Sequence, residues 1–301
     1  MKRVAIYVDS EWAFGSIHYE LCKYLVGCGI DAQLLPWKTS YSVAEMAELD
    51  AVVDVYLTTP TGYIVLQRDY GIDPGKIVVV VHGIIDFYDM INAHGQQEFA
   101  RPRMFAVVSE FLKAKAAELG IEREPIVLPL GINTGRYHAP PATRLRAVGY
   151  AAAFTRVDNH TQYDLKRGYL VEQCARGAGL EFRVAQTYHN SFVTMPGFYA
   201  GVDCVITAST EEGAGLPALE AGAAGRLVIS TPVGHWPEKV GVRGGHEVPI
   251  DEAAFVTETT KLLVRYRDDA TAFEKKCRAI QKHAATYDWL HVIDRWASVL
   301  H

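Results

Sequence analysis

The chain has 301 residues, of which 49% are hydrophobic and 22% charged. At about 150 residues per domain, this length predicts two domains or one large one. The composition is ordinary for a globular protein, which excludes disorder, collagen and coiled coil as the main architecture. The 30 basic and 35 acidic side chains leave a net charge of -5, so the chain as a whole does not attract nucleic acid or an anionic membrane.

The first half of the chain alternates short apolar runs with helix-length segments. Ser109 is expected to cap the helix at 110–119, and Gly120 to end it. Several apolar runs have no polar residue at all, which is typical of strands covered on both faces in a parallel sheet. Strands are expected at 3–8, 32–35, 51–57, 77–81, 104–108 and 125–128, and a further helix at 16–26.

The second half repeats this alternation. The segment 136–144 between the two halves contains adjacent prolines and no periodicity, so it is the expected linker. The pattern predicts two doubly wound α/β domains with a ligand site in the cleft between them. Strands are expected at 147–152, 181–185, 204–207 and 227–230, and helices at 168–176, 216–224, 251–267, 271–284 and 289–300.

The sequence favours a cytoplasmic location. No stretch reaches the roughly 18 uncharged apolar residues that a membrane span requires. The apolar run at 4–8 is short and is followed by Asp9 and Glu11, which is unlike a secretory signal. The five cysteines are scattered and show no CxxC spacing, so we expect them to be buried reduced thiols.

The most informative segment runs from residue 203 to residue 238. Its expected strand leads into a loop with Gly213 and Gly215, and glycines allow backbone to approach a ligand closely. Pro217 suits the first turn of the helix that follows, because no N–H group is needed there. Glu212 and Glu220 flank this turn eight residues apart, and we expect both at the mouth of the cleft.

The start of this helix is a candidate anion site. The free N–H groups of Ala214, Gly215 and Leu216 would point at an anion, which the helix dipole also attracts.

These features together resemble a known signature. Glu212-x7-Glu220 with an internal GxGLP, an alanine-rich helix and a strand ending in TPVG is similar to the donor site of retaining glycosyltransferases of family 4. Residues 109–112, 129–133, 199–203 and 287–289 resemble further passages of that family. The resemblance implies the GT-B fold, with two Rossmann-like, doubly wound parallel-sheet domains facing across a cleft. They would be an acceptor-side domain at 1–140 and a nucleotide-sugar-binding domain at 141–286, and a terminal helix at 287–301 would cross back to the first.

The resemblance also implies a task for each matched residue. Glu212 would hold hydroxyls of the donor sugar and Glu220 the ribose of the nucleotide, while the amides at the helix start would hold the diphosphate. Arg156 and Lys166 resemble the basic pair that neutralises the departing diphosphate, although Arg167 competes with Lys166 for that role.

Two residues of the first domain also match. His82 would lie at a strand end near the sugar and the acceptor, and Gly15 would belong to a turn that faces the phosphates. Bland alternatives stay open: Glu220 as a solvated helix carboxylate, His82 as a buried histidine bonded to backbone, and Arg156 and Lys166 as solvated loop charges.

The implied chemistry is that of a hexosyltransferase of EC 2.4 that needs neither a metal nor a prosthetic group. Two cations and a helix N-terminus can stabilise a departing diphosphate. No DxD-like pair follows a strand where it would hold Mg²⁺. The leaving-group oxygen would assist removal of the acceptor proton on the same face, so no carboxylate nucleophile is required, unlike in retaining glycoside hydrolases.

The donor and acceptor are less defined. The stretch after Ala185, where the family normally holds the nucleobase, is short. A UDP-sugar is favoured from the family alone and a GDP-sugar stays open. A glycan, a lipid-linked sugar or a small molecule is the favoured hydroxyl acceptor, with peripheral membrane contact as a further expectation; the oligomeric state stays open.

Three other functions compete with this interpretation. Residues 213–218 also spell GxGxxA, but the internal Pro217 and the lack of an acid at the end of the next strand disfavour a dehydrogenase. The short base region suggests a nucleotide-binding protein without transfer activity. A transferase acting on nucleic acid would need Arg101, Arg103, Lys113 and Lys115 to form a basic patch.

Overall fold

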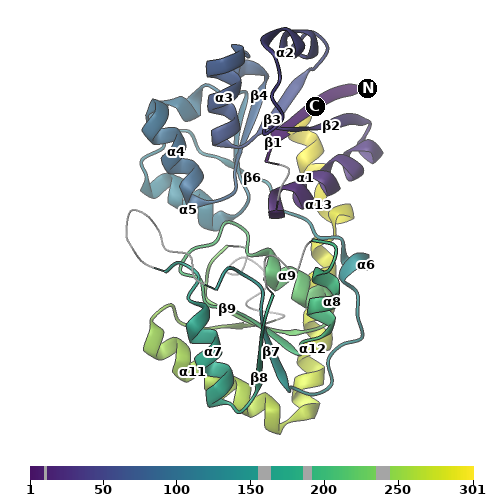
Figure 1. Ribbon diagram of the computed structural model, residues 1–301, viewed down its shortest axis with the longest axis vertical. Coiled ribbons are helices and arrows are strands. Elements are labelled where there is room, and N and C mark those ends of the chain that lie inside the picture. The colour runs from purple at the N-terminus through teal and green to yellow at the C-terminus, as the bar shows by residue number, and fades with distance from the viewer. Residues whose placement is uncertain (10–11, 155–163, 186–191, 235–244) are drawn as a thin grey trace. The chain divides into compact units, whose positions relative to one another are not determined.

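The structure is a computed structural model that describes residues 1–9, 12–154, 164–185, 192–234 and 245–301 (Figure 1). The chain forms two compact units. The first unit comprises Met1–Gly131 together with Trp289–His301, and the second unit comprises Ile132–Asp288. The domain boundaries expected after residues 140 and 286 stay predictions, and each unit is described by itself.

The described part of the first unit contains a six-stranded parallel sheet in the order β2-β1-β3-β4-β5-β6. Its strands are β1 (Lys2–Val8), β2 (Ile30–Pro36), β3 (Val55–Thr58), β4 (Ile77–Val81), β5 (Met104–Val107) and β6 (Ile126–Val127). Its helices are α1 (Trp12–Leu25), α2 (Val43–Asp50), α3 (Pro60–Tyr70), α4 (Ile84–His94), α5 (Glu110–Glu118) and α13 (Trp289–Leu300). Every residue of β3 and β4 is buried, as expected for strands covered on both faces.

Three strands of the first unit were predicted too long: those expected at 51–57, 104–108 and 125–128 correspond to the shorter β3, β5 and β6. The expected strand 51–57 begins only at Val55, because Ala51 is the C-terminal cap of α2 and has helical dihedral angles. The predicted helix cap at Ser109 is confirmed. Its side chain accepts a hydrogen bond from the Leu112 N–H at the start of α5. Gly120 has a φ of 71° just after this helix, which suits glycine at a helix end.

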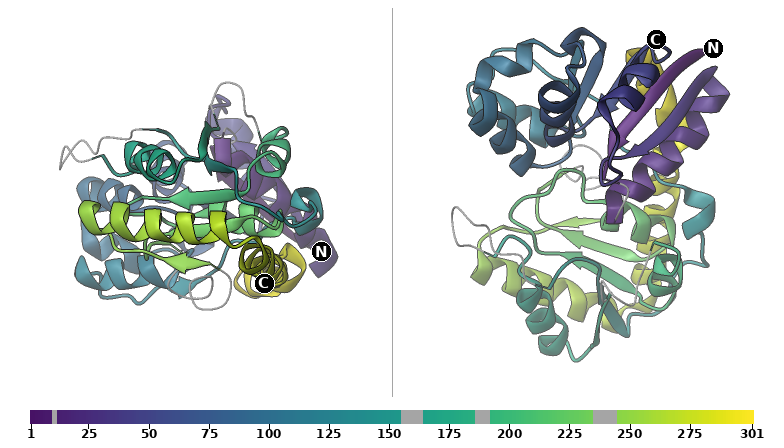
Figure 2. Two further views of the ribbon diagram at one scale, coloured as in Figure 1. Left: turned by 90° about the horizontal axis from the view of Figure 1, so that it is seen from below. Right: turned by 45° about the horizontal axis from the view of Figure 1, so that its top comes forward.

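The terminal helix α13 is part of the first unit and lies beside α1 (Figure 1). The indole N–H of Trp296 donates to the carbonyl of Pro129 at 2.9 Å. A Cβ on Gly131 would lie 2.5 Å from the ring of Trp289, so only glycine lets this ring pack so closely. The Lys2 ammonium donates to the carbonyl of His301, and Figure 2 also shows the two chain ends near each other.

The described part of the second unit contains a five-stranded parallel sheet in the order β11-β10-β9-β7-β8. Its strands are β7 (Ala147–Tyr150), β8 (Glu181–Val184), β9 (Cys204–Thr207), β10 (Leu227–Ser230) and β11 (His246–Glu247). Its helices are α6 (Thr134–Tyr137), α7 (Gly168–Gly177), α8 (Met195–Ala200), α9 (Leu216–Ala223), α11 (Glu252–Asp268) and α12 (Ala270–Ala284).

The strand order of the second unit reverses beside β7. This strand pairs with β8 on one side and with β9 on the other, so the chain crosses over β7 between them. In an open parallel sheet, ligands bind outside the carboxyl ends of the strands at such a reversal. The loops that follow β7 and β9 therefore occupy the favoured place for a site within this unit.

Two further expectations concern membranes and cysteines. Within the residues that the structure describes, no helix is long and apolar enough to span a membrane. All five cysteines are free, and Cys174, Cys204 and Cys277 are buried. The expectation of burial was wrong for Cys22 and Cys28, which are half-buried. Cys22 lies in the last turn of α1 and Cys28 in the short 3₁₀ turn after it.

Candidate functional site

The strand-to-helix turn after β9 has the geometry that the motif predicts. The helix α9 begins at Leu216, and Gly215 precedes it with a φ of 71°, a conformation that favours glycine. Pro217 lies in the first turn of the helix, where its missing N–H removes no hydrogen bond. A Cβ on Gly215 would meet no atom within 4 Å, so open space adjoins the turn.

A second glycine presses against this turn from the end of the neighbouring strand. Gly234 follows β10 and has a φ of 64°. A Cβ at this position would lie 2.7 Å from the carbonyl carbon of Ala214 and 3.1 Å from the amide nitrogen of Gly215. The backbone at Gly234 therefore supports the turn at a distance that no larger residue allows.

Lys166 and Glu212 meet at the strand-order reversal. The Lys166 ammonium forms an ion pair with the Glu212 carboxylate, and the two side chains are 13% and 17% exposed. The Ser209 hydroxyl donates to the same carboxylate oxygen at 2.7 Å. One partner follows β7 and the other follows β9, so the two predicted residues come together although 46 residues separate them in the chain.

Backbone contacts fix the position of Lys166. The Asp164 carboxylate accepts from the N–H groups of Lys166 at 2.9 Å and of Arg167 at 3.2 Å. The Tyr150 hydroxyl donates to the Lys166 carbonyl at 2.8 Å. The Thr210 N–H donates to the Leu165 carbonyl at 3.0 Å, which joins the loop after β7 to the loop that carries Glu212.

Arg167 performs a different task from its neighbour. Among the described residues it is the one non-glycine residue with a positive φ, 50°. Its side chain is only 4% exposed. It donates from Nε to the Ala208 carbonyl at 2.7 Å and from Nη1 to the Ile250 carbonyl at 2.6 Å. Lys166 thus contacts Glu212, whereas Arg167 holds the backbone at the end of β9.

Glu220 lies on α9 and is bonded to two tyrosines. Its Oε1 accepts from the Tyr137 hydroxyl at 2.8 Å and its Oε2 from the Tyr199 hydroxyl at 2.6 Å. Burial raises the pKa of the Glu220 carboxyl, while the two tyrosine bonds and the nearby charge of Arg136 act in the opposite direction. Sequence reasoning missed both tyrosine partners; the signal available was that Tyr199 opens a matched motif stretch, while Tyr137 lies in the expected linker.

The two predicted residues of the first unit, Gly15 and His82, are both associated with α1. Gly15 is buried in the first turn of α1 and not in a turn before that helix. His82 directly follows β4 and is half-buried, and its backbone N–H donates to the Asp86 carboxylate at 2.7 Å. Its ring meets that of His18, also on α1, edge to face at 5.3 Å. Burial and the His18 charge hold the pKa of His82 well below its ordinary value of 6.5, so its ring is neutral at pH 7.

Two other features bear on the expected site. Arg156 lies outside the described residues. Within the described ranges, no group of three or more His, Cys, Asp or Glu side chains is placed to hold a metal ion.

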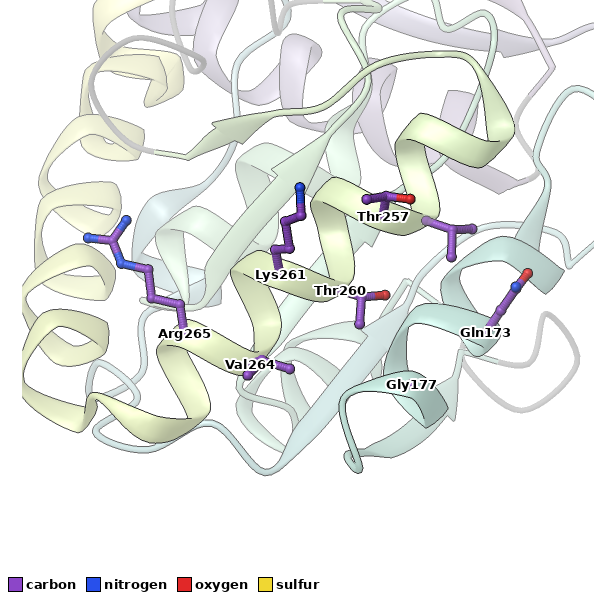
Figure 3. Close-up of a pocket in the computed structure, with 8 residues that line it drawn as sticks. Gln173, Gly177, Thr257, Thr260, Lys261, Val264 and Arg265 are labelled. Carbon is purple, nitrogen blue, oxygen red and sulfur yellow. The ribbon is translucent and has the colours of Figure 1, made fainter.

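A separate groove lies between α7 and α11 (Figure 3). It measures about 680 Å³ and runs between Gln173 and Gly177 on one side and Thr257, Thr260 and Val264 on the other. None of the predicted site residues that the structure describes lines it.

Comparison with known families gives a match over part of the second unit. Residues 162–274 match the family described as Glycosyl transferases group 1. No curated protein sequence matches the chain. The matched range contains Lys166, the glycine turn and both glutamates of the motif. The match supports a glycosyltransferase, EC 2.4, as the class of this enzyme.

Solved structures resemble the whole chain. Anabaena HepE in complex with UDP and glucose has a TM-score of 0.72 at 13% identity, over 100% of this chain and 99% of that chain. Sucrose-phosphate synthase from Thermosynechococcus elongatus has a TM-score of 0.66 at 12% identity, over 99% and 98%. A glycosyltransferase from Rickettsia africae has a TM-score of 0.65 at 16% identity, over 99% and 98%. With the two parallel sheets, these likenesses show that the fold is GT-B.

Proposed function

We propose that this protein is a retaining, metal-independent glycosyltransferase that moves a sugar from a nucleotide diphosphate donor to a hydroxyl acceptor. The observation that carries the proposal is the pair of Lys166 and Glu212 beside the first turn of α9. The pair lies at the strand-order reversal, within the range that matches the glycosyltransferase family. The UDP and the glucose bound in the HepE structure favour a UDP-sugar as donor, with a GDP-sugar as the alternative.

In the proposed reaction the bond between the sugar C1 and the diphosphate oxygen breaks, and its electron pair stays on that oxygen. The Lys166 ammonium and the N-terminal amides of α9 stabilise the charge that develops there. The acceptor hydroxyl oxygen forms the new bond to C1 on the same face. Its proton passes to the departing diphosphate, so no carboxylate of the protein becomes a nucleophile.

The remaining roles follow the family resemblance. Glu212 would hold donor hydroxyls, Arg156 would assist Lys166, and His82 would lie near the sugar and the acceptor. The neutral His82 ring that its lowered pKa implies suits a hydrogen bond to a hydroxyl.

The arrangement of basic side chains disfavours a nucleic-acid acceptor. Arg101 is paired with Glu98 at 2.9 Å, Lys113 with Glu124 at 2.5 Å and Lys115 with Glu118 at 2.6 Å. A carboxylate therefore neutralises three of the four cations that such a patch would need. We therefore place a glycan, a lipid-linked sugar or a small molecule before nucleic acid as acceptor.

The test is a binding and turnover panel with the full chain. Nucleoside diphosphates and their sugars are screened by thermal shift, because a ligand that binds only the native state raises the melting temperature. The sugars that bind are then incubated with the enzyme, and proton NMR follows the anomeric configuration of the first product released. We expect slow hydrolysis of one donor with retained configuration, unchanged by EDTA.

Each part of the proposal can fail separately in this panel. Binding of nucleoside diphosphates without hydrolysis of any donor would leave the nucleotide-binding protein as the function. Inversion at C1 would contradict retention, and loss of turnover in EDTA with recovery on adding Mg²⁺ or Mn²⁺ would contradict metal independence.

A further inference from the structure

The carboxylate of Glu220 is held from both sides by phenol hydroxyls that come from separate helices. Tyr137 ends α6 and Tyr199 lies in α8, and each donates to a different oxygen of the carboxylate. Tyr137 is 3% exposed and Tyr199 is fully buried. Their rings meet edge to face at 5.8 Å, so packing fixes both hydroxyls.

This arrangement leaves part of the carboxylate available to a ligand. An ionised carboxylate offers about four lone-pair sites on its two oxygens, and the two tyrosines occupy one site on each oxygen. The Glu220 side chain is half-buried, so it reaches the surface of the second unit. The remaining acceptor sites, one on each oxygen, match two neighbouring hydroxyls of one ligand.

The positive charge nearby does not take up these acceptor sites. Arg136 stacks on the ring of Phe192 at 3.4 Å from its centroid and donates from Nη2 to the Phe192 carbonyl at 2.6 Å. Its charge acts on Glu220 from this stacked position. The carboxylate therefore keeps its capacity to accept bonds from neutral hydroxyls.

We propose that Tyr137 and Tyr199 are positioning residues that orient the Glu220 carboxylate toward the ribose diol of the nucleotide, and that they thereby make the site select ribonucleotides over 2′-deoxyribonucleotides. This inference rests on the proposed function, which places a nucleotide at this motif. Rotation of the carboxylate would break both tyrosine bonds, so its orientation is fixed before the ligand arrives. Fixing a binding group in advance lowers the entropy lost on binding.

The first unit contains a tyrosine–carboxylate bond of the same kind, which serves to test whether the tyrosines at Glu220 have a purely structural role. The Tyr63 hydroxyl donates to the Glu98 carboxylate at 2.6 Å, and this carboxylate also accepts from Arg101 at 2.9 Å. Tyr63 is fully buried and Glu98 is 7% exposed. Tyr63→Phe therefore removes the same kind of bond at a place with no proposed ligand, and it serves as the control.

The experiment measures UDP and 2′-deoxy-UDP binding by calorimetry, with GDP and 2′-deoxy-GDP run in parallel. The proteins are the wild type, Tyr137→Phe, Tyr199→Phe, the double variant and Tyr63→Phe. We expect the wild type to bind the ribonucleotide about 10-fold more tightly than the deoxyribonucleotide, as for one hydrogen bond to a charged group. Each tyrosine variant should bring this ratio toward 1, the double variant most, while Tyr63→Phe leaves it unchanged.

The outcomes separate this inference from the function on which it rests. If no nucleoside diphosphate binds the wild type, the proposed function fails. If the wild type prefers the ribonucleotide and folded tyrosine variants keep the same ratio, the positioning role is overturned. Both ligands are measured on one preparation, so a loss of folded protein cancels in the ratio. If Tyr199→Phe does not fold, Tyr137→Phe alone decides the test.

Discussion

Glu212 and Glu220 stand at the two ends of one motif, and the protein surrounds them in opposite ways. Glu212 is paired with the Lys166 ammonium, whereas Glu220 accepts from the neutral phenols of Tyr137 and Tyr199. A carboxylate paired with a cation presents little net charge, while one bonded to neutral hydroxyls keeps its charge as an acceptor. The comparison teaches that spacing alone does not set what each carboxylate can do. Their partners, supplied by distant segments, make the difference.

The largest effect on activity is expected from replacing Lys166, the ion-pair partner of Glu212. Lys166→Ala should lower kcat for donor hydrolysis by about 10²–10³-fold, the usual cost of removing one group that stabilises charge in a transition state. Single-turnover hydrolysis of the donor measures this change. Lys261→Ala is the control, because that lysine pairs with Glu258 on the exposed face of α11.

This prediction also tests the contrast between the two glutamates. If Lys166→Ala retained full activity, the Lys166 ammonium that pairs with Glu212 would have no part in the reaction, and the ion pair would not distinguish the function of the two ends of the motif.

The second effect concerns the backbone beneath Glu212. Arg167→Met removes the buried guanidinium together with its two hydrogen bonds. The carbonyls of Ala208 and Ile250 then lose that donor. We expect the free energy of unfolding to fall by about 3 kcal/mol, since bonds to charged groups are strong and their unpaired partners are costly. Urea unfolding measures it.

The control for this change is Arg278→Met, because Arg278 forms an exposed ion pair with Glu274 one turn away on α12. That substitution should shift the free energy of unfolding by no more than about 0.5 kcal/mol. Equal effects of the two substitutions would show that Arg167 contributes no more than a surface arginine.

The third effect tests the glycine turn that separates the two carboxylates. Gly234→Ala meets a positive φ and also places a Cβ 2.7 Å from Ala214. Gly29→Ala meets the same kind of φ, 76°, with no atom within 4 Å. The left-handed conformation costs roughly 1–2 kcal/mol in both, so thermal unfolding should show a larger loss at Gly234. UDP affinity should also fall only there, and equal affinity in both variants would argue against contact between turn and nucleotide.

The smallest effect is expected from the pH dependence of Glu220. Its pKa is raised above 4.5 by burial, so the folded state holds this proton more tightly than the unfolded state. As pH rises from below 4.5 through the raised value, ionisation of Glu220 therefore lowers the free energy of unfolding. Glu220→Gln lacks this titration, so the wild type should lose stability relative to the variant as pH rises. Urea unfolding at several pH values checks this, and a difference independent of pH would contradict it.

Much of the fold could be predicted because its strands are uninterrupted apolar runs. The expected strands 77–81, 204–207 and 227–230 coincide with β4, β9 and β10, whose side chains are almost entirely buried. The helix α2 could not be found in this way, because its buried residue is Met46 and it has no apolar stripe. Its capping box, in which Ser42 and Glu45 bond each other's N–H groups, was the available local signal.

The candidate site was predictable only in part, for a related reason. The motif and its resemblance pointed to Lys166 and Glu212 as residues of one site. They did not point to the tyrosines at Glu220, which lie 83 and 21 residues away in the chain. Contacts between such distant segments depend on how the helices pack, which no local pattern records. Which of the two neighbours Lys166 and Arg167 contacts Glu212 likewise depends on the backbone conformation at Arg167, where φ is positive.

The two ends of the second unit are joined to each other. The Ile132 N–H donates to the Tyr287 carbonyl at 2.9 Å, and Asp288 accepts from the N–H and the hydroxyl of Thr134. Residues 132–288 are thus one continuous insert, whereas the first unit is assembled from two pieces of chain. Because these two ends lie together, replacing residues 132–288 as one block would require the two pieces of the first unit to be joined to the new block at a single place.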